Sequence, residues 1–234
     1  MMTTTAHGWT IEPQTIAPAT AFAKVQVRPR TMWVQQVTHP LLVLGSGQSE
    51  VVPLGVSVAG HEVVRRRTGG AAVWLDANLW WADVSITRND VLWSDDVGHA
   101  FQWLGRVMAA AIGTLLDDAS VCERDATAPR LRVHEGPLIT TAWSRVVCFA
   151  GLGPGEVTAD GRKLVGLSQR RTREGAVFQV GVLLRWEPAT WCGLLHVPNG
   201  VLDDLAVGLE HLCGEAVPPS RVTAAVTRAL DSVL

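Results

Sequence analysis

The sequence predicts an α+β fold, a sandwich built on a mixed β-sheet and packed with a few helices. Segments rich in β-branched and aromatic residues cluster in blocks, and segments with helical spacing of apolar residues are set apart from them. The chain has 234 residues, of which 47% are hydrophobic and 18% are charged, enough for one sizeable core. We therefore expect a single domain over residues 1–234, with an irregular N-terminal segment at 1–30 and C-terminal helices at 201–234.

Strands are predicted where apolar and β-branched residues alternate or run together between turn residues. The run at 79–87 is almost continuously apolar, which indicates a strand buried on both faces. Asp160-Gly161 is typical of a hairpin turn that would bring Cys148 and Lys163 onto neighbouring structure. Gly69 and Gly70 would form the tip of a second hairpin. The predicted strands cover residues 31–37, 40–44, 62–67, 72–75, 79–87, 137–149, 162–169 and 176–186.

One long helix is predicted between Asp95-Asp96, which would cap its start, and Asp117-Asp118 at its end. Leucine spacing at 201–212, and the proline-serine start before 222–234, predict two C-terminal helices. A short helix at 19–25 is also expected. Apolar residues of the long helix recur at three- and four-residue spacing on one stripe, formed by Phe101, Leu104, Val107, Met108, Ala111, Ile112 and Leu115.

Charge and composition exclude several classes of protein. The net charge is −2, so no polyelectrolyte signal favours a nucleic-acid partner, although Arg65, Arg66 and Arg67 could hold a small anion. The four cysteines are scattered without the close pairs of a metal site, and no metal is expected. No signal peptide and no apolar run of about 18 residues is found, so we expect no membrane partner and a cytoplasmic location.

The stretch 148–184 combines a candidate nucleophile, a lysine and a glycine-rich connection. A thiol needs a neighbouring positive charge or dipole to be a useful nucleophile at neutral pH, and Lys163 could supply that charge to Cys148. Lys163 is one of only two lysines beside 18 arginines, which favours a role for a compact ammonium, although chance would explain it too. Cys148 could equally be a small buried hydrophobic residue at the end of a strand.

The Arg65–Arg67 cluster is followed directly by glycines. Glycine lets the backbone turn its N–H groups toward a ligand, and arginines at the base would neutralise a phosphate or carboxylate. An ordinary tight turn beside a solvated basic face is the alternative. Ten tryptophans and no tyrosine are expected to fill the core, although Trp74 or Trp81 could line a tunnel for an acyl chain.

Two groups of motifs in the same order resemble the biotin/lipoate protein ligase superfamily, and its octanoyltransferase branch most of all. The upstream group is Arg65-Arg66-Arg67-Thr68-Gly69-Gly70-Ala71-Ala72-Val73 with Asp76 and Asn78, preceded by the Gly45-Ser46-Gly47-Gln48 turn. The downstream group is Cys148-Phe149, Glu156, Gly161-Arg162-Lys163-Leu164-Val165-Gly166, Ser168-Gln169-Arg170, Gln179 and Gly181.

The resemblance implies a biotin/lipoate protein ligase-like catalytic domain that attaches an octanoyl or lipoyl group to a lysine of a lipoyl domain. In this reading Cys148 carries the acyl group as a thioester, Lys163 lies beside the acyl carbonyl, and no cofactor is required. The implied partners are acyl carrier protein and lipoyl domain proteins, namely glycine cleavage H protein or a 2-oxoacid dehydrogenase E2. The implied substrate-binding residues are Arg65, Arg66, Arg67, Thr68, Gly69, Gly70, Ala71, Asp76, Asn78, Glu156, Gly166, Ser168, Gln179 and Gly181.

Two other functions stay open. An ATP-dependent lipoate–protein ligase would use ATP and Mg, with the arginine-glycine loop on the carboxylate and α-phosphate. A non-catalytic acyl or lipoyl-domain binding protein is suggested by Val180 and Val182, which stand where the family has His and Ser or Thr, so that polar groups near the pocket would have become apolar. Further departures are Ala71 for a third glycine, Leu75 where the family often has His, and Leu167 within Gly-Ser-Ala.

Overall fold

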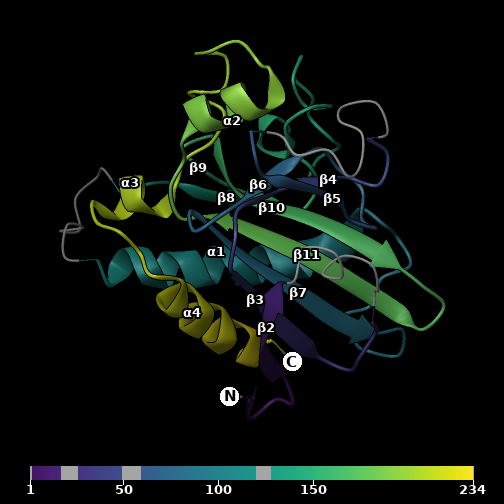
Figure 1. Cartoon of the computed structure of the whole chain (residues 1–234). Coiled ribbons are helices and arrows are strands. Elements are labelled where there is room, and N and C mark those ends of the chain that lie inside the picture. The colour runs from purple at the N-terminus through teal and green to yellow at the C-terminus, as the bar shows by residue number, and fades with distance from the viewer. Residues whose placement is uncertain (1, 17–25, 49–58, 120–127, 234) are drawn as a thin grey trace.

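The computed structural model describes residues 2–16, 26–48, 59–119 and 128–233 (Figure 1). It confirms the predicted α+β class, with a large mixed sheet, a small sheet and a few helices. The strands are β1 Thr3–Thr4, β2 Thr10–Ile16, β3 Thr31–Val37, β4 Leu41–Leu44, β5 Glu62–Arg65, β6 Val73–Leu75, β7 Leu79–Thr87, β8 Leu131–Val133, β9 Val157–Ala159, β10 Arg162–Arg171 and β11 Gly175–Leu183. The helices are η1 His99–Phe101, α1 Gln102–Asp117, η2 Cys148–Ala150, α2 Pro188–Leu195, α3 Leu209–Cys213 and α4 Pro219–Asp231, where η marks a 3₁₀ turn.

The large sheet has the order β1-β2-β3-β7-β11-β10-β9-β8. Its neighbours are antiparallel except for β2 and β3, which are parallel. β7 and β11 pair along their whole length, from Leu79 opposite Leu183 to Thr87 opposite Gly175. Every residue of β11 is buried, as expected for a central strand covered on both faces.

Helices α1 and α4 cover one face of the large sheet, and the small sheet covers the other (Figure 1). On the helical face, the ring of Phe178 in β11 packs edge-on against Trp103 of α1, at 5.6 Å between centroids. On the opposite face, the Thr68 hydroxyl, in the loop after β5, donates to Gln179 of the same strand. Alternate residues of a strand face opposite sides, so Phe178 packs against the helices while its neighbour Gln179 faces the loop that contains Thr68.

Helix α1 is preceded by η1, and the expected aspartate cap acts on that turn. Asp96 Oδ1 accepts a hydrogen bond of 2.6 Å from the backbone N–H of His99. The predicted apolar stripe is buried along α1, except that Phe101 belongs to η1 and is half-buried. Within the described part of the chain, no helix is both long enough and apolar enough to cross a membrane.

The predicted glycine-tipped hairpin is wrong. The small sheet has the order β5-β4-β6, so β4 lies between the two strands that were expected to pair. The strand also ends at Arg65 and not at Arg67, and the Arg66 side chain lies in the interior, where it is 1% exposed. The glycines instead allow two loops to touch, because a Cβ on Gly45 would lie 1.8 Å from the carbonyl oxygen of Gly70.

Two other segments differ from the predictions. The N-terminal segment 1–30 contains β1 and β2 rather than irregular structure alone, because β2 completes the parallel pair with β3. Residues 137–149 form turns and bridges instead of a long strand. The hydroxyls of Thr141 and Ser144 both donate to the carbonyl of Ala150, and such local side-chain bonds compete with sheet pairing.

The C-terminal part is helical over shorter ranges than predicted. Residues 201–205 form turns, and α3 begins only at Leu209, because Gly208 passes so close to Arg185 that a Cβ there would lie 2.6 Å from its Cα. Helix α2 was not predicted, since its apolar sequence has no clear stripe. Helix α4 confirms the last predicted helix. The short helix expected at 19–25 lies outside the described residues.

We predict that Gly45→Ala destabilises the protein by about 3 kcal/mol, because the new methyl group would collide with a backbone carbonyl that cannot rotate away. Gly47→Ala is the matched control, since a Cβ there would meet nothing within 4 Å. Urea unfolding of both variants measures the difference. Equal stabilities for the two variants would show that the two loops do not touch in this way.

Candidate active site

Cys148 is fixed by its backbone to the loop that follows the arginine cluster. Its N–H donates to the carbonyl of Ala72 at 2.9 Å, and the N–H of Ala72 donates to Val146 at 3.1 Å. Gln48 ties the same segment to the small sheet, with Nε2 donating to Arg145 and Oε1 accepting from Gly45. The two regions that carry the motifs are therefore hydrogen-bonded to each other at Cys148 and at the residues just before it.

Arg66 is the cation next to the Cys148 sulfur. Its guanidinium donates to the carbonyls of Gly69 at 2.8 Å and Ala71 at 3.0 Å. A Cβ on Gly70 would lie 2.8 Å from Arg66 Nη2 and 3.6 Å from the Cys148 sulfur, so the two groups are neighbours around Gly70. Burial lowers the pKa of Arg66, while the nearby side chains of Cys148 and Glu156 act in the opposite direction. Arg66 therefore folds the glycine loop around itself and offers positive charge to the thiol.

Lys163 lies beneath the Cys148 turn and is 4% exposed. Its ammonium forms an ion pair of 2.6 Å with Glu156 Oε2 and donates to the carbonyls of Cys148 and Gly151, each at 2.9 Å. These three acceptors match the three N–H donors of a lysine ammonium. In this arrangement Lys163 holds the turn that presents Cys148.

Glu156 is the acidic partner in this ion pair, and its carboxylate accepts further hydrogen bonds. Its Oε2 also accepts from the N–H of Gly153 at 2.6 Å, and its Oε1 accepts from the N–H of Leu167 at 2.9 Å. A buried ion pair is tolerated when the remaining lone pairs are hydrogen-bonded in this way. Glu156 thus contacts protein groups and does not line the cavity at Cys148.

The cavity at Cys148 is narrow. Its free volume of about 20 Å³ is room for about one water molecule. An acyl chain would require the surrounding side chains to move apart. The lining residues are Arg66, Val73, Trp81, Cys148, Phe149, Gly166, Leu167, Ser168, Gln179 and Gly181.

The predicted residues Arg66, Gly166, Ser168, Gln179 and Gly181 are thus brought together with Cys148. The Thr68 hydroxyl joins the same wall. It donates to Gln179 Oε1 at 2.5 Å and accepts from the Ser168 hydroxyl at 3.0 Å. Of the two tryptophans considered for a tunnel, Trp81 lines this cavity and Trp74 does not.

Val180 and Val182 do not remove polar groups from the cavity wall, contrary to the prediction. Both are fully buried, and they alternate with Gln179 and Gly181, which line the cavity. They therefore share the opposite face of β11 with Phe178, which packs on α1. Valine suits these two core positions, and Leu75 is likewise fully buried in the core.

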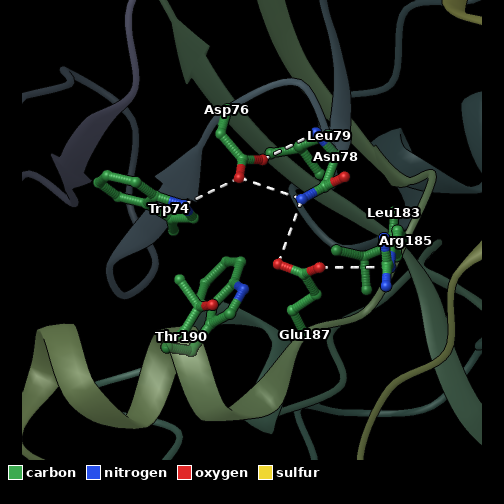
Figure 2. Close-up of a pocket in the computed structure, with 9 residues that line it drawn as sticks. Trp74, Asp76, Asn78, Leu79, Leu183, Arg185, Glu187 and Thr190 are labelled. Atoms are coloured by element: carbon green, nitrogen blue, oxygen red, sulfur yellow. Dashed lines mark hydrogen bonds and ion pairs between the residues drawn. The ribbon is translucent and has the colours of Figure 1, made fainter.

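Asp76 and Asn78 are not brought to Cys148. They line a separate small hollow beside α2 that shares no residue with the Cys148 cavity (Figure 2). Asp76 accepts from the Trp74 ring N–H at 3.0 Å and from the Asn78 backbone at 2.8 Å, and Asn78 donates to Glu187 at 3.4 Å. Burial raises the pKa of Asp76. These contacts stabilise the turn into β7.

The remaining loop residues lie toward the rim of the site. Arg65 is half-buried and donates to the carbonyl of Gly45 at 3.4 Å, while Arg67, Gly69 and Gly70 are exposed. Ala71 is buried and contributes its carbonyl to Arg66. Among the residues that the structure describes, no three His, Cys, Asp or Glu side chains gather as a metal-binding group.

Sequence reasoning missed Asp83, in the middle of β7. Asp83 Oδ2 accepts from Gln35 at 2.9 Å, and Asp83 lies directly opposite Gln179 in the sheet. Burial raises the pKa of Asp83 to about 6, although the nearby side chains of Gln179, Trp81 and Gln35 oppose this rise. The sequence did contain a signal for Asp83, since it is the single carboxylate within the apolar run 79–87 and a buried carboxylate needs polar partners.

The sequence matches the model of a known family. The model of the lipoyl protein ligase A/B catalytic domain matches residues 19–231, and the chain belongs to this family. It is 27% identical over 218 residues to octanoyltransferase LipM of Kyrpidia tusciae, covering 88% of this chain and 76% of that protein.

Solved structures share the fold. A lipoate-protein ligase A bound with ATP has a TM-score of 0.65 at 14% identity, covering 94% of this chain and 82% of that one. A bipartite lipoate protein ligase from Thermoplasma acidophilum has a TM-score of 0.59 at 15% identity, covering 94% and 80%.

We predict that Glu156→Gln lowers the free energy of unfolding by about 3 kcal/mol, because it leaves the Lys163 ammonium buried without its counter-charge. Glu135→Gln, on an exposed residue, is the control and should change stability by less than about 0.5 kcal/mol. Chemical denaturation measures both. A Glu156→Gln protein as stable as the wild type would mean that the ion pair contributes nothing to the fold.

We predict that Asp83→Asn stabilises the protein increasingly as pH rises. The folded-state pKa is raised to about 6 from an ordinary value of 3.8, so the stability linked to protonated Asp83 is present below about pH 4 and is lost as pH rises through about 6. The advantage of asparagine should approach about 3 kcal/mol at pH 8. Thermal unfolding from pH 4 to pH 8 tests this, with exposed Asp204→Asn as the control. A pH-independent difference would contradict it.

Proposed function

We propose that this protein is an acyltransferase that carries an octanoyl or lipoyl-type group as a thioester on Cys148 and transfers it to a lysine of a lipoyl domain. The observation that carries the proposal is the position of Cys148 beside the buried guanidinium of Arg66, at the wall of a cavity in a chain of the lipoyl ligase family. An arginine beside a thiol favours the reactive thiolate. The relationship to an octanoyltransferase supports the same chemistry.

The reaction has two balanced steps. In the first, the Cys148 sulfur attacks the carbonyl carbon of an acyl thioester, a new C–S bond forms, and the bond to the carrier sulfur breaks. The departing thiol takes up the proton that Cys148 gave up. In the second, the lysine amine of the lipoyl domain attacks the Cys148 thioester, an amide bond forms, and the Cys148 thiol is restored. Neither step requires ATP.

The surrounding residues supply position and charge. Arg66 lies beside the sulfur, while Lys163 and Glu156 hold the turn that carries Cys148. The ammonium of Lys163 lies at the carbonyl of Cys148, but its charge is paired with Glu156, so in this arrangement it holds the turn and does not stabilise the acyl oxygen. A direct bond from Lys163 to that oxygen would require the ammonium to leave one of its present acceptors.

The ligase alternative has weaker support. A structural neighbour is described as a lipoate-protein ligase A bound with ATP, and this chain keeps the arginine-glycine loop of the family. Arg66, the buried cation of that loop, however, already donates to the carbonyls of Gly69 and Ala71. The residues at the loop thus fit an ATP phosphate poorly in this arrangement, and Arg67 at the rim is the exposed cation there. The non-catalytic binding-protein alternative loses the observation that suggested it, because Val180 and Val182 face the core.

The proposed partners are an acyl carrier protein as donor and a lipoyl domain as acceptor. One structural neighbour is described as a bipartite ligase with its E2 lipoyl domain, which supports this class of acceptor. The proposal for a donor rests on the thioester chemistry of Cys148.

We predict that incubation with octanoyl carrier protein adds one octanoyl group to the protein, and that Cys148→Ala abolishes the adduct. Cys192 and Cys213 are buried at 2% and 1% exposure, so they should not compete. Cys122→Ser is the matched control and should keep the adduct. Intact mass and peptide mapping measure it. An adduct that persists in Cys148→Ala contradicts the thioester mechanism, and lipoate labelling that needs ATP and survives the loss of Cys148 favours the ligase.

A further inference from the structure

A groove lies between helix α4 and the strands β2 and β3 (Figure 1). Trp80 of β7 forms part of its wall, whereas the next residue, Trp81, lines the cavity at Cys148. Because consecutive residues of a strand face opposite sides of the sheet, the groove and that cavity lie on opposite faces. The groove has a volume of about 900 Å³, within the range of about 300–1,000 Å³ that is typical of small-molecule sites.

Helix α4 leaves this space open because of the residues on its two sides. The helix packs on α1, and its buried residues include Val222, Val226 and Leu230. The residues that line the groove form a separate stripe at three- and four-residue spacing. Most of them are small, so they do not fill the space between the helix and the strands. They are Ser220, Thr223, Ala224, Thr227 and Arg228.

The wall of the groove is largely apolar. On the strand side it is formed by Ile11, Val34 and other apolar residues of β2 and β3. On the helix side, the Thr223 hydroxyl accepts from the Trp80 ring N–H and donates to the carbonyl of Pro219, each at 3.0 Å. The Thr227 hydroxyl donates to the carbonyl of Thr223 at 2.8 Å. These hydroxyls are already engaged, so the wall favours a ligand with an apolar body.

Arg228 supplies the positive charge of the groove. Within the described part of the chain it is the one cation that lines the groove, and its exposed guanidinium has no hydrogen-bond or ion-pair partner there. The carboxylate that lines the groove, Asp76, is engaged by the Trp74 ring N–H and by Asn78. A ligand in the groove would therefore meet an available cation, which a carboxylate complements.

The length of the groove limits the size of the ligand. It follows α4 from Ser220 to Arg228, a span of eight residues that rises by about 12 Å in an α-helix. An extended chain of about ten carbons is about 11 Å long, because each C–C bond of about 1.5 Å advances the chain by about 1.3 Å. Such a chain would reach from a carboxylate at Arg228 to a methyl end near Ser220.

We propose that this groove binds a free medium-chain fatty carboxylate, with Arg228 on the carboxylate and the apolar wall on the chain. The site shares no lining residue with the cavity at Cys148. It goes beyond the proposed acyl transfer and does not depend on it, since no covalent step is involved.

The direct test is a titration of the ¹⁵N-labelled protein with decanoate, followed by the backbone amide signals. We expect saturable shifts along residues 220–228. Ala224→Trp should weaken binding by at least about tenfold, because the indole would occupy the space of the chain. Ala110→Trp, the same change at an exposed position of α1, is the matched control and should leave binding intact. Absence of binding overturns the proposal, as do shifts confined to Ser168 and Gln179, which would place decanoate at the Cys148 cavity.

The charge is tested separately. Arg228→Gln should weaken the binding of decanoate by about fivefold, the upper end of what one exposed ion pair contributes, whereas Arg106→Gln, at an exposed position of α1, should not. Decyltrimethylammonium, which has the same chain and the opposite charge, should bind more weakly than decanoate. Equal binding of the two would show that the groove does not select a carboxylate. A wild-type dimer in sedimentation that Ala224→Trp dissociates would show that a second copy covers the groove, and would also overturn the proposal.

Discussion

The buried ion pair between Lys163 and Glu156 is the contact on which the arrangement around Cys148 depends. Two charges at 4% to 5% side-chain exposure are stable only when every donor and acceptor is engaged, and here the surrounding backbone engages them. The ammonium takes the carbonyls of Cys148 and Gly151, while the carboxylate takes the N–H groups of Gly153 and Leu167. Four backbone groups, one in the Cys148 turn and three after it, are thereby fixed to one pair of side chains.

A second buried cation acts from the other side. Arg66 closes the glycine loop through backbone carbonyls and lies beside the Cys148 sulfur, and close contact between Gly45 and Gly70 brings that loop against the small sheet. Cys148 therefore lies between two buried cationic side chains, of which Lys163 is neutralised by Glu156. Arg66 lies beside the sulfur, and Lys163 contacts the carbonyl of the same residue. These contacts hold the Cys148 turn in place, as the proposed thioester chemistry requires.

Local patterns in the sequence were enough for part of this picture. Asp160 and Gly161 have φ angles of 50° and 82°, as the predicted two-residue hairpin requires, and the apolar stripe of α1 follows from helical spacing. The resemblance to the family also implied that the arginine loop and the Cys148 stretch serve one function. Local patterns could not predict which distant strands pair or which layer covers each face of a strand. That β4 separates β5 from β6, and that Val180 faces the helices while Gln179 faces the cavity, depends on which layers cover each sheet. Likewise, only the fold shows that Lys163 engages Glu156.

The most direct test of the account is a single-turnover transfer from the acylated protein. The protein is loaded with an octanoyl group on Cys148, freed of donor, and mixed with an unmodified lipoyl domain without ATP. The account predicts that the thioester on Cys148 disappears at the same rate as an octanoyl amide appears on the lipoyl domain, with one group transferred per protein. A thioester that remains on Cys148 while the lipoyl domain stays unmodified, or transfer that occurs only after ATP is added, would contradict it.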